Sequence, residues 1–150
     1  MIPNLLFTGD PGTGKTSLAK VLINALGIEE YDVLEINASR ENGIDVIREK
    51  VNGFVLTMPF GKFKVVLLDE ADFITQAGQA TLRNDIESYS STARFILTCN
   101  YRDKIIPALK SRCYEFQVTK PDVTEYTCRA ANVLVNEGID FEIEVLGAVS

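Results

Sequence analysis

The sequence predicts an α/β protein built on a parallel β-sheet with helices on both faces. Short apolar runs of strand length alternate along the chain with longer segments whose apolar residues recur at helical spacing. The run Lys64–Leu68 is apolar and bounded by charge, which is typical of a strand covered on both faces. With 150 residues, 46% of them hydrophobic, the chain can bury the core of one domain and part of a second.

Each element is predicted from its own stretch of sequence. Five strands are expected at the apolar runs Asn4–Thr8, Asp32–Asn37, Lys64–Leu68, Arg94–Thr98 and Cys113–Val118. Three amphipathic helices are expected between them: one that follows a glycine-rich turn and ends at Gly27, one from Ile44 to Val55, and one from Thr75 to Tyr89. Thr75 is the expected N-cap of the third helix, because its hydroxyl can accept a backbone N–H of the first turn.

A domain boundary is expected just before Pro121, since proline suits the first turn of a new helix. Residues 1–119 then form one domain, and residues 120–150 begin a second, helical one. The first strand begins almost at Met1, and the last helical pattern stops at Ser150 without a cap. These two features indicate a piece of a longer protein.

Composition argues against several classes of protein. The net charge of −6 argues against a broad basic surface for nucleic acid, although local phosphate contacts within an assembly remain open. The cysteines Cys99, Cys113 and Cys128 follow no metal-ligand spacing and no histidine is present, which favours small buried residues in a reducing compartment over a zinc site. The chain carries neither a signal-peptide pattern nor the run of about 20 apolar residues that a membrane helix needs. We therefore expect a cytoplasmic protein without membrane contact, in a bacterial host cell or at the nucleoid if it is viral.

The strongest motif is a glycine-rich loop between the first strand and the first helix. It consists of Gly9, Asp10, Pro11, Gly12, Thr13, Gly14, Lys15 and Thr16, followed by Ser17, and it matches the pattern GxxxxGK[ST]. Glycines let backbone N–H groups converge on phosphate oxygens, and the helix N-terminus favours the negative charge. Lys15 is expected at the β- and γ-phosphates of ATP, and the Thr16 hydroxyl at a bound Mg²⁺.

Two carboxylates end the third expected strand. Asp69 and Glu70 follow the apolar run at the edge where open α/β sheets bind ligands. Asp69 is expected to hold Mg²⁺, through water, and Glu70 to deprotonate the attacking water. Solvated acids at a strand end are the alternative interpretation, and the spacing after the glycine-rich loop argues against it.

Three further residues are weaker candidates when taken alone. Asn100 ends the run Phe95–Asn100, which overlaps the fourth expected strand, within reach of a γ-phosphate or the attacking water, and Asn37 ends the second expected strand. Both are also common turn-forming residues. Arg112 in Ser111-Arg112-Cys113 suits a phosphate contact across a subunit interface, but an exposed arginine is more often a solvated charge.

These motifs in this order resemble the AAA+ ATPases, and among them the small subunits of sliding-clamp loaders of the replication factor C type. The stretches that carry the resemblance are VLEINASRENGIDVIREKV, VVLLDEADFITQAGQATLRNDIESYSS, FILTCN and IIPALKSRC. The run IESYSSTARFILTCN followed by SRC is similar to the loader subunit of T4-type phages. The resemblance implies a five-stranded P-loop core followed by the start of a lid domain.

The resemblance also implies roles for the weaker candidates. Asn100 takes the sensor-1 position, which reads the γ-phosphate. Arg112 is implied as an arginine finger that acts in trans, on ATP held by a neighbouring subunit. Asn37 matches a regulatory residue that keeps the catalytic Glu70 inactive until DNA is bound.

The implied partners are other loader subunits in an oligomer with five subunits expected, a sliding clamp, and primer–template DNA. Arg48 and Arg83 are the candidate DNA contacts, since their helices line the central chamber in the family. The implied function is that ATP binding opens the clamp and DNA-triggered hydrolysis releases it during replication. The alternatives are another AAA+ ATPase such as a helicase loader or unfoldase, a DEAD-type helicase suggested by the string Asp69–Asp72, and a loader subunit that binds nucleotide without hydrolysing it.

Overall fold

The computed structural model describes residues 2–41 and 43–119, and within them five strands form one parallel sheet in the order β2-β3-β4-β1-β5. The strands are β1 (Leu5–Thr8), β2 (Val33–Asn37), β3 (Lys64–Asp69), β4 (Ala93–Cys99) and β5 (Tyr114–Gln117). The helices are α1 (Lys15–Ala25), α2 (Ile44–Val55), α3 (Gln76–Ser88) and the short α4 (Pro107–Lys110). The predicted parallel α/β architecture is confirmed.

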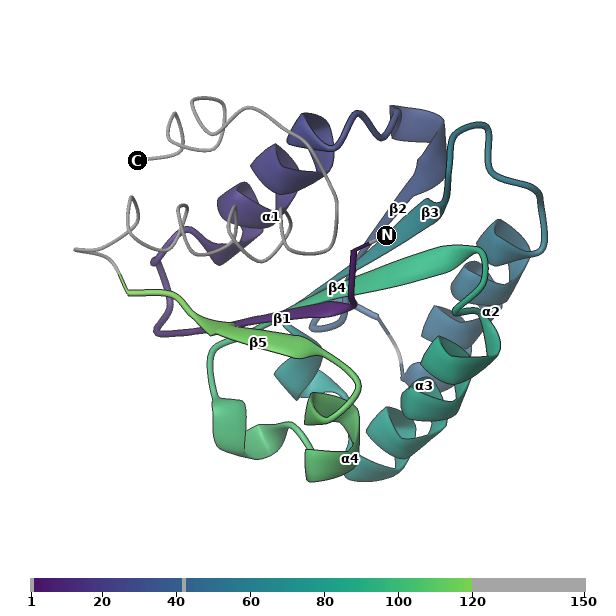
Figure 1. The fold of residues 1–150 in the computed structure, drawn as a ribbon. Coiled ribbons are helices and arrows are strands. Elements are labelled where there is room, and N and C mark those ends of the chain that lie inside the picture. Colours follow the sequence, from purple (N-terminus) through teal and green to yellow (C-terminus); the bar gives the residue numbers. More distant parts are fainter. Residues whose placement is uncertain (1, 42, 120–150) are drawn as a thin grey trace.

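Helices cover both faces of the sheet, with α1 on one side and α2, α3 and α4 on the other (Figure 1). Alternation along β1 sends Leu5 and Phe7 into the core beneath α1 and Leu6 into the core beneath the other helices. The apolar segment of β3 is buried at every position from Val65 to Leu68, as expected of a strand covered on both faces.

Short turns of 3-10 helix, which the sequence pattern did not predict, lie at Glu30–Asp32 (η1), Ala71–Phe73 (η2) and Arg102–Lys104 (η3). Asp32 was expected to begin the second strand but lies in η1 instead. Its buried carboxylate accepts the backbone N–H groups of Phe60 and Gly61, at 3.0 and 2.8 Å. This contact explains why a charged residue occupies a buried strand entrance.

The start of α3 agrees with the prediction, because the Thr75 side chain accepts the N–H of Gly78 at 3.1 Å. Inside α3, the buried side-chain amide of Gln79 donates to the carbonyls of Ile74 and Lys104, over 3.0 and 2.8 Å. Its oxygen accepts the N–H of Ile106 at 2.8 Å. Gln79 thus ties α3 to the segment that leads into α4, and Arg112 follows α4 by two residues.

The second domain expected over 120–150, with Cys128, lies outside the described residues, so the expected boundary stays a prediction. None of the helices in the described ranges has the length and apolarity that crossing a membrane requires. The two other cysteines lie within the fold, Cys99 buried and Cys113 half-buried. Burial raises the pKa of each thiol to about 12, so both stay protonated at neutral pH.

Candidate nucleotide-binding and catalytic site

The candidate site is a pocket at the carboxyl edge of the sheet, where the glycine-rich loop passes from β1 into α1. Its lining residues are Pro11, Gly12, Gly14, Lys15, Thr16, Ser17, Asp69, Glu70, Thr98 and Asn100. Six of the nine expected nucleotide residues therefore line one cavity with the expected magnesium and sensor residues, and the other three, Gly9, Asp10 and Thr13, line an adjoining cavity. Gly9, Gly12 and Gly14 all have positive φ angles, at 153°, 81° and 85°, which is why the loop needs glycine at these positions.

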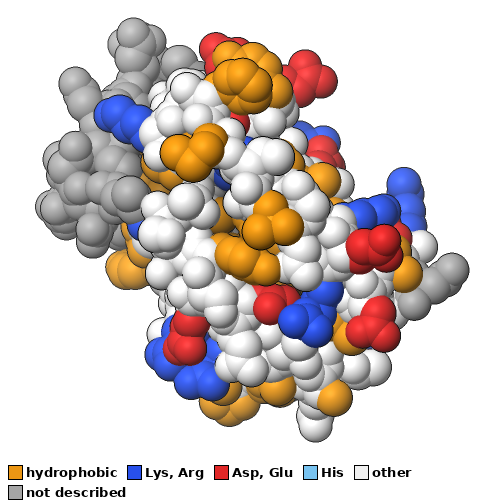
Figure 2. All heavy atoms as spheres, turned by 90° about the vertical axis from the view of Figure 1, so that its right-hand side faces the viewer, with side chains coloured by type: hydrophobic (Ala, Val, Ile, Leu, Met, Phe, Trp, Pro, Cys, Tyr) orange, Lys and Arg blue, Asp and Glu red, His pale blue; other side chains and the backbone are white. Residues whose placement is uncertain are grey.

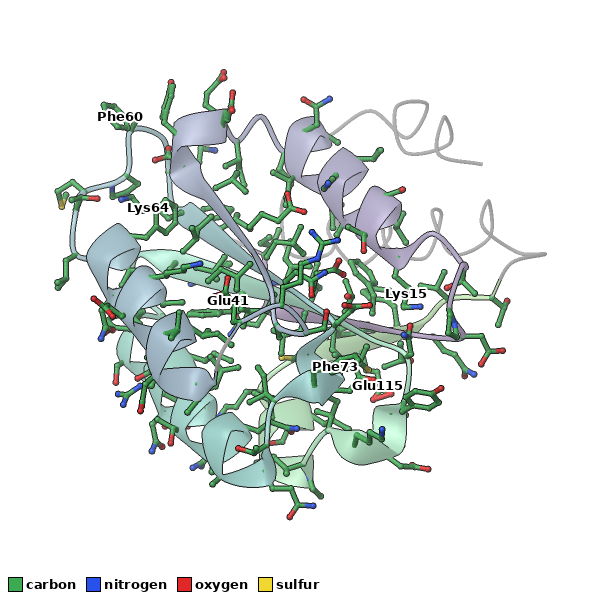
Figure 3. The ribbon with its side chains drawn as sticks, turned by 180° about the vertical axis from the view of Figure 1, so that it is seen from behind. Lys15, Glu41, Phe60, Lys64, Phe73 and Glu115 are labelled. Atoms are coloured by element: carbon green, nitrogen blue, oxygen red, sulfur yellow. The ribbon has the colours of Figure 1, made fainter. Side chains whose placement is uncertain are left out.

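Lys15 lies at the start of α1, beside the sheet (Figure 3). Its ammonium group donates to the carbonyls of Gly9 and Asp10 over 2.9 and 2.8 Å, and to Thr13 Oγ1 over 3.2 Å. Burial lowers the pKa of Lys15, while nearby acidic groups such as Asp10 and Asp69 oppose that shift. The loop thus holds a poorly hydrated cation beside the N–H groups of the helix start.

Asp69 joins the acidic strand end to the glycine-rich loop. Thr16 Oγ1 donates to Asp69 Oδ1 over 2.7 Å, and the Thr98 hydroxyl contacts the same carboxylate oxygen. Two oxygen ligands of the kind that Mg²⁺ prefers, the Thr16 hydroxyl and the Asp69 carboxylate, therefore converge. Thr98 was not a candidate in the sequence, because a threonine inside an apolar strand is ordinary.

Glu70 turns the chain sharply at the end of β3. Its φ angle is +56°, which makes it the one non-glycine residue with positive φ among residues 2–41 and 43–119. Its backbone N–H donates to Thr98 Oγ1 over 3.0 Å, which anchors the turn to β4. A strained backbone of this kind is typical of functional sites, since the surrounding structure must maintain it.

Asn37 reaches Glu70 through an intermediate residue. Asn37 pairs with Asp69 across the β2–β3 register, which places it one residue away from Glu70 in the neighbouring strand. Its side chain contacts Ser39 in the turn after β2, and the Ser39 hydroxyl in turn contacts the Glu70 carboxylate. The sequence pattern did not single out Ser39.

Asn100 follows β4 and lines the pocket, as expected of a γ-phosphate sensor position. The Asp72 carboxylate fixes the backbone here, since its Oδ2 accepts the N–H groups of Asn100 and Tyr101 at 3.3 and 3.2 Å. The fourth letter of the DEAD string is therefore a buried residue that orients the candidate sensor.

Arg112 lies away from the glycine-rich loop of its own chain. It precedes β5, whose first residue Tyr114 is opposite Leu5 at the amino end of β1, whereas the loop follows the carboxyl end of β1 at Thr8. Its guanidinium contacts the carboxylate of Glu87 on α3. This placement agrees with a finger that does not act on nucleotide in its own pocket.

The two candidate DNA contacts both have acidic partners within the chain. Arg48 Nε donates to Asp85 Oδ2 over 2.9 Å, and Arg83 Nη2 lies 3.7 Å from Glu87 Oε1. Figure 2 shows the face that carries α2 and α3, where acidic and basic side chains lie side by side. Phosphate binding by either arginine requires exchange of its carboxylate partner.

Comparison with known proteins identifies the family. The model of the ATPase family associated with various cellular activities (AAA) matches residues 5–121. This chain belongs to the AAA family.

Its relatives include proteins named replication factor C small subunit. Those of Aeropyrum pernix, Sulfurisphaera tokodaii and Methanocella arvoryzae are 50%, 44% and 41% identical to this AAA chain over 99% of its length. The alignments cover 47%, 46% and 47% of these relatives, so the chain spans about half of their length. The particular similarity to T4-type phage subunits stays a prediction.

Solved structures support the fold. A DNA polymerase III gamma subunit-related protein from Thermotoga maritima matches with a TM-score of 0.67 and 21% identity, over 89% of this chain and 49% of that one. RuvB from the same organism matches with a TM-score of 0.63 and 18% identity, over 89% and 44% of the two chains. Both therefore share the arrangement of sheet and helices that positions the AAA pocket.

Proposed function

We propose that this AAA chain binds ATP with Mg²⁺ and hydrolyses it as a small subunit of a sliding-clamp loader. The observation that carries the proposal is the 2.7 Å hydrogen bond from Thr16 to Asp69, with Glu70 next in the chain. It joins the phosphate-binding loop to the acidic strand end in one pocket. Similarity to replication factor C small subunits supports the assignment to a loader.

The residues present fit ATP with Mg²⁺. Thr16 and Asp69 offer a hydroxyl and a carboxylate, and hard oxygen ligands of this kind suit Mg²⁺. The loop N–H groups and Lys15 suit the phosphates, for which Lys15 exchanges its carbonyl partners in the loop. Bound Mg²⁺ neutralises charge on the phosphate oxygens during transfer.

The remaining steps belong to the side chains of the chain itself. Glu70 accepts a proton from the attacking water, and Asn100 orients that water or the γ-phosphate from the end of β4. Arg112 stabilises transition-state charge in the pocket of a neighbouring subunit, where its planar guanidinium can donate to two oxygens. One chain then supplies the pocket and the next chain supplies the finger.

The proposed partners are other loader subunits in a five-membered oligomer, a sliding clamp, and primer–template DNA. Because the net charge is −6, DNA binding requires several subunits to act together. Arg48 and Arg83 contribute to it once they exchange Asp85 and Glu87 for phosphates.

ATP turnover by the complete protein in its reconstituted assembly tests the proposal. We expect hydrolysis that rises when clamp and primer–template DNA are added together, and that is lost in Glu70→Gln. ATP hydrolysis indifferent to clamp and DNA would favour another AAA role, such as a helicase loader or unfoldase. Mg-ATP binding without turnover under all conditions would favour a structural loader subunit.

A further inference from the structure

The Glu70 carboxylate contacts Ser39, a residue to which the sequence analysis assigned no role. Ser39 Oγ lies at hydrogen-bond distance from Glu70 Oε2 and 2.6 Å from Asn37 Oδ1. The Ser39 backbone N–H also donates to Asn37 Oδ1, over 2.9 Å. Among the hydrogen bonds of residues 2–41 and 43–119, none joins Asn37 directly to Glu70, so Ser39 is the link between them.

A count of protons decides how the link works. The Ser39 hydroxyl has one proton and two neighbouring acceptors, Asn37 Oδ1 and the Glu70 carboxylate. Asn37 Oδ1 already accepts the Ser39 N–H, whereas the carboxylate is charged and is the stronger acceptor. The hydroxyl proton therefore goes to Glu70, and the bond from the Ser39 backbone N–H to Asn37 Oδ1 orients Ser39.

The sheet order gives the direction of this restraint. β2 lies on one side of β3, whereas β4 and β1, which leads into the glycine-rich loop, lie on the other. A bond to Ser39, which follows β2, thus draws the Glu70 carboxylate toward the outer strand β2 and away from the phosphate-binding loop, which follows β1. We propose that Ser39 is a positioning residue that holds Glu70 away from the attacking water, and that Asn37 acts on Glu70 only through Ser39.

The inference rests on the proposed ATP hydrolysis and is tested on the complete protein in its assembly. Single-turnover hydrolysis is measured at saturating Mg-ATP, with and without primer–template DNA. Ser39→Ala removes one hydrogen bond to a charged group, so the DNA-free rate should rise about ten- to a hundredfold. The stimulation by DNA should shrink by the same factor, with ATP affinity unchanged. Ser39→Thr keeps the hydroxyl and should stay near the wild-type rate.

Coupling between the two residues separates positioning from a general structural effect. Asn37→Ala should raise the DNA-free rate in the wild type and should add nothing in Ser39→Ala, because one residue acts through the other. Ser91→Ala, an exposed serine in the turn before β4, is the matched control and should behave as wild type. The ¹³C resonance of the Glu70 carboxyl group reports the contact without turnover, and it should move in Ser39→Ala but not in Ser91→Ala.

Two results would overturn the inference while hydrolysis itself stands. One is an unchanged DNA-free rate in Ser39→Ala, and the other is an undiminished effect of Asn37→Ala when Ser39 is already alanine. A wild type that is no faster than Glu70→Gln would instead overturn the proposed hydrolysis. In that case a Glu70 resonance that does not move in Ser39→Ala would show that Ser39 does not contact Glu70, and the inference would fall as well.

Discussion

Glu87 on α3 forms an ion pair with the guanidinium of Arg112, which follows α4 by two residues. The same carboxylate oxygen, Glu87 Oε1, lies 3.7 Å from Arg83 Nη2. One acid therefore serves both the proposed arginine finger and a proposed DNA contact. All three side chains are at least one-third exposed, so water screens these pairs strongly.

Because the pair is exposed, releasing Arg112 from Glu87 should cost little. Glu87→Gln should change the free energy of unfolding by no more than about 1 kcal/mol. Turnover in the assembly should stay within about fivefold of wild type, because the free energy needed to separate Arg112 from Glu87 is no larger than about 1 kcal/mol. Urea denaturation and steady-state hydrolysis are the measurements. A loss of several kcal/mol would mean that Glu87 is a structural anchor instead.

Gly9 should tolerate no side chain. A Cβ atom at this position would lie 2.3 Å from the carbonyl oxygen of Val118, and φ is +153°. Gly9→Ala should therefore destabilise the fold by about 1–3 kcal/mol and weaken ATP binding, because the loop must move.

Gly53→Ala provides the matched control for Gly9→Ala. Gly53 lies within α2, and a Cβ there meets nothing within 4 Å. Alanine should stabilise this helix by about 0.5–1 kcal/mol. Equal effects of the two substitutions on urea midpoints would contradict the close approach of Gly9 to Val118.

Lys15→Ala should remove the one cation that the loop directs at the phosphates. We expect ATP affinity, measured by calorimetry, to fall about a hundredfold or more, as lost charge-assisted hydrogen bonds predict. Lys20→Ala is the control, since Lys20 lies on the exposed side of the same helix and pairs with Glu35 at 3.2 Å. Similar affinities in the two variants would rule out a phosphate role for Lys15.

Glu70→Gln should separate binding from chemistry. The amide keeps the shape of the side chain but cannot accept the proton, so turnover should fall about 10²–10⁴-fold while Mg-ATP stays bound. Asp69→Asn should instead raise the Mg²⁺ concentration that ATP binding requires, because Asp69 is the proposed metal ligand beside Thr16. If Glu70→Gln turned over ATP at the wild-type rate, the base would have to be another group.

The sequence predicted the backbone well, because strands and helices carry their own periodic signals. The glycine-rich loop and the Asp69-Glu70 pair were also predicted from the sequence, because their residues lie together in short motifs. Thr98 was not, because only the β3–β4 register, with Leu68 opposite Leu97, brings its hydroxyl to Asp69. Ser39 and Gln79 were missed for the same reason: their partners are distant in sequence, and no local pattern marks either residue.

The sequence also could not predict the ion-pair partners of the two candidate DNA-binding arginines. Arg48 and Arg83 share one helix-lined face, yet their partners depend on how α2 and α3 pack. The role of Arg112 toward a neighbouring subunit is inferred from its position in this chain. That position, at the amino edge of the sheet, leads to the prediction that tests the loader assignment most directly.

Arg112 should act in trans. Because it lies near Tyr114 at the amino end of β5, away from the loop after Thr8, Arg112→Ala should leave ATP affinity of the chain unchanged. In the assembly, hydrolysis at the neighbouring site should fall about 10³–10⁵-fold, as for arginine fingers in related phosphoryl transfers. Arg112→Lys should restore little, since lysine lacks the planar fork of donors.

Mixed assemblies give the decisive measurement for Arg112. Subunits with Arg112→Ala keep an intact pocket, and subunits with Lys15→Ala keep an intact finger, so a mixture places the two side by side. Activity should therefore return in mixtures although neither variant is active alone. Absence of recovery in mixtures with demonstrated co-assembly would count against a trans role. Full turnover by a dilute, monomeric wild-type chain would exclude it, because no neighbour is then present to supply the guanidinium.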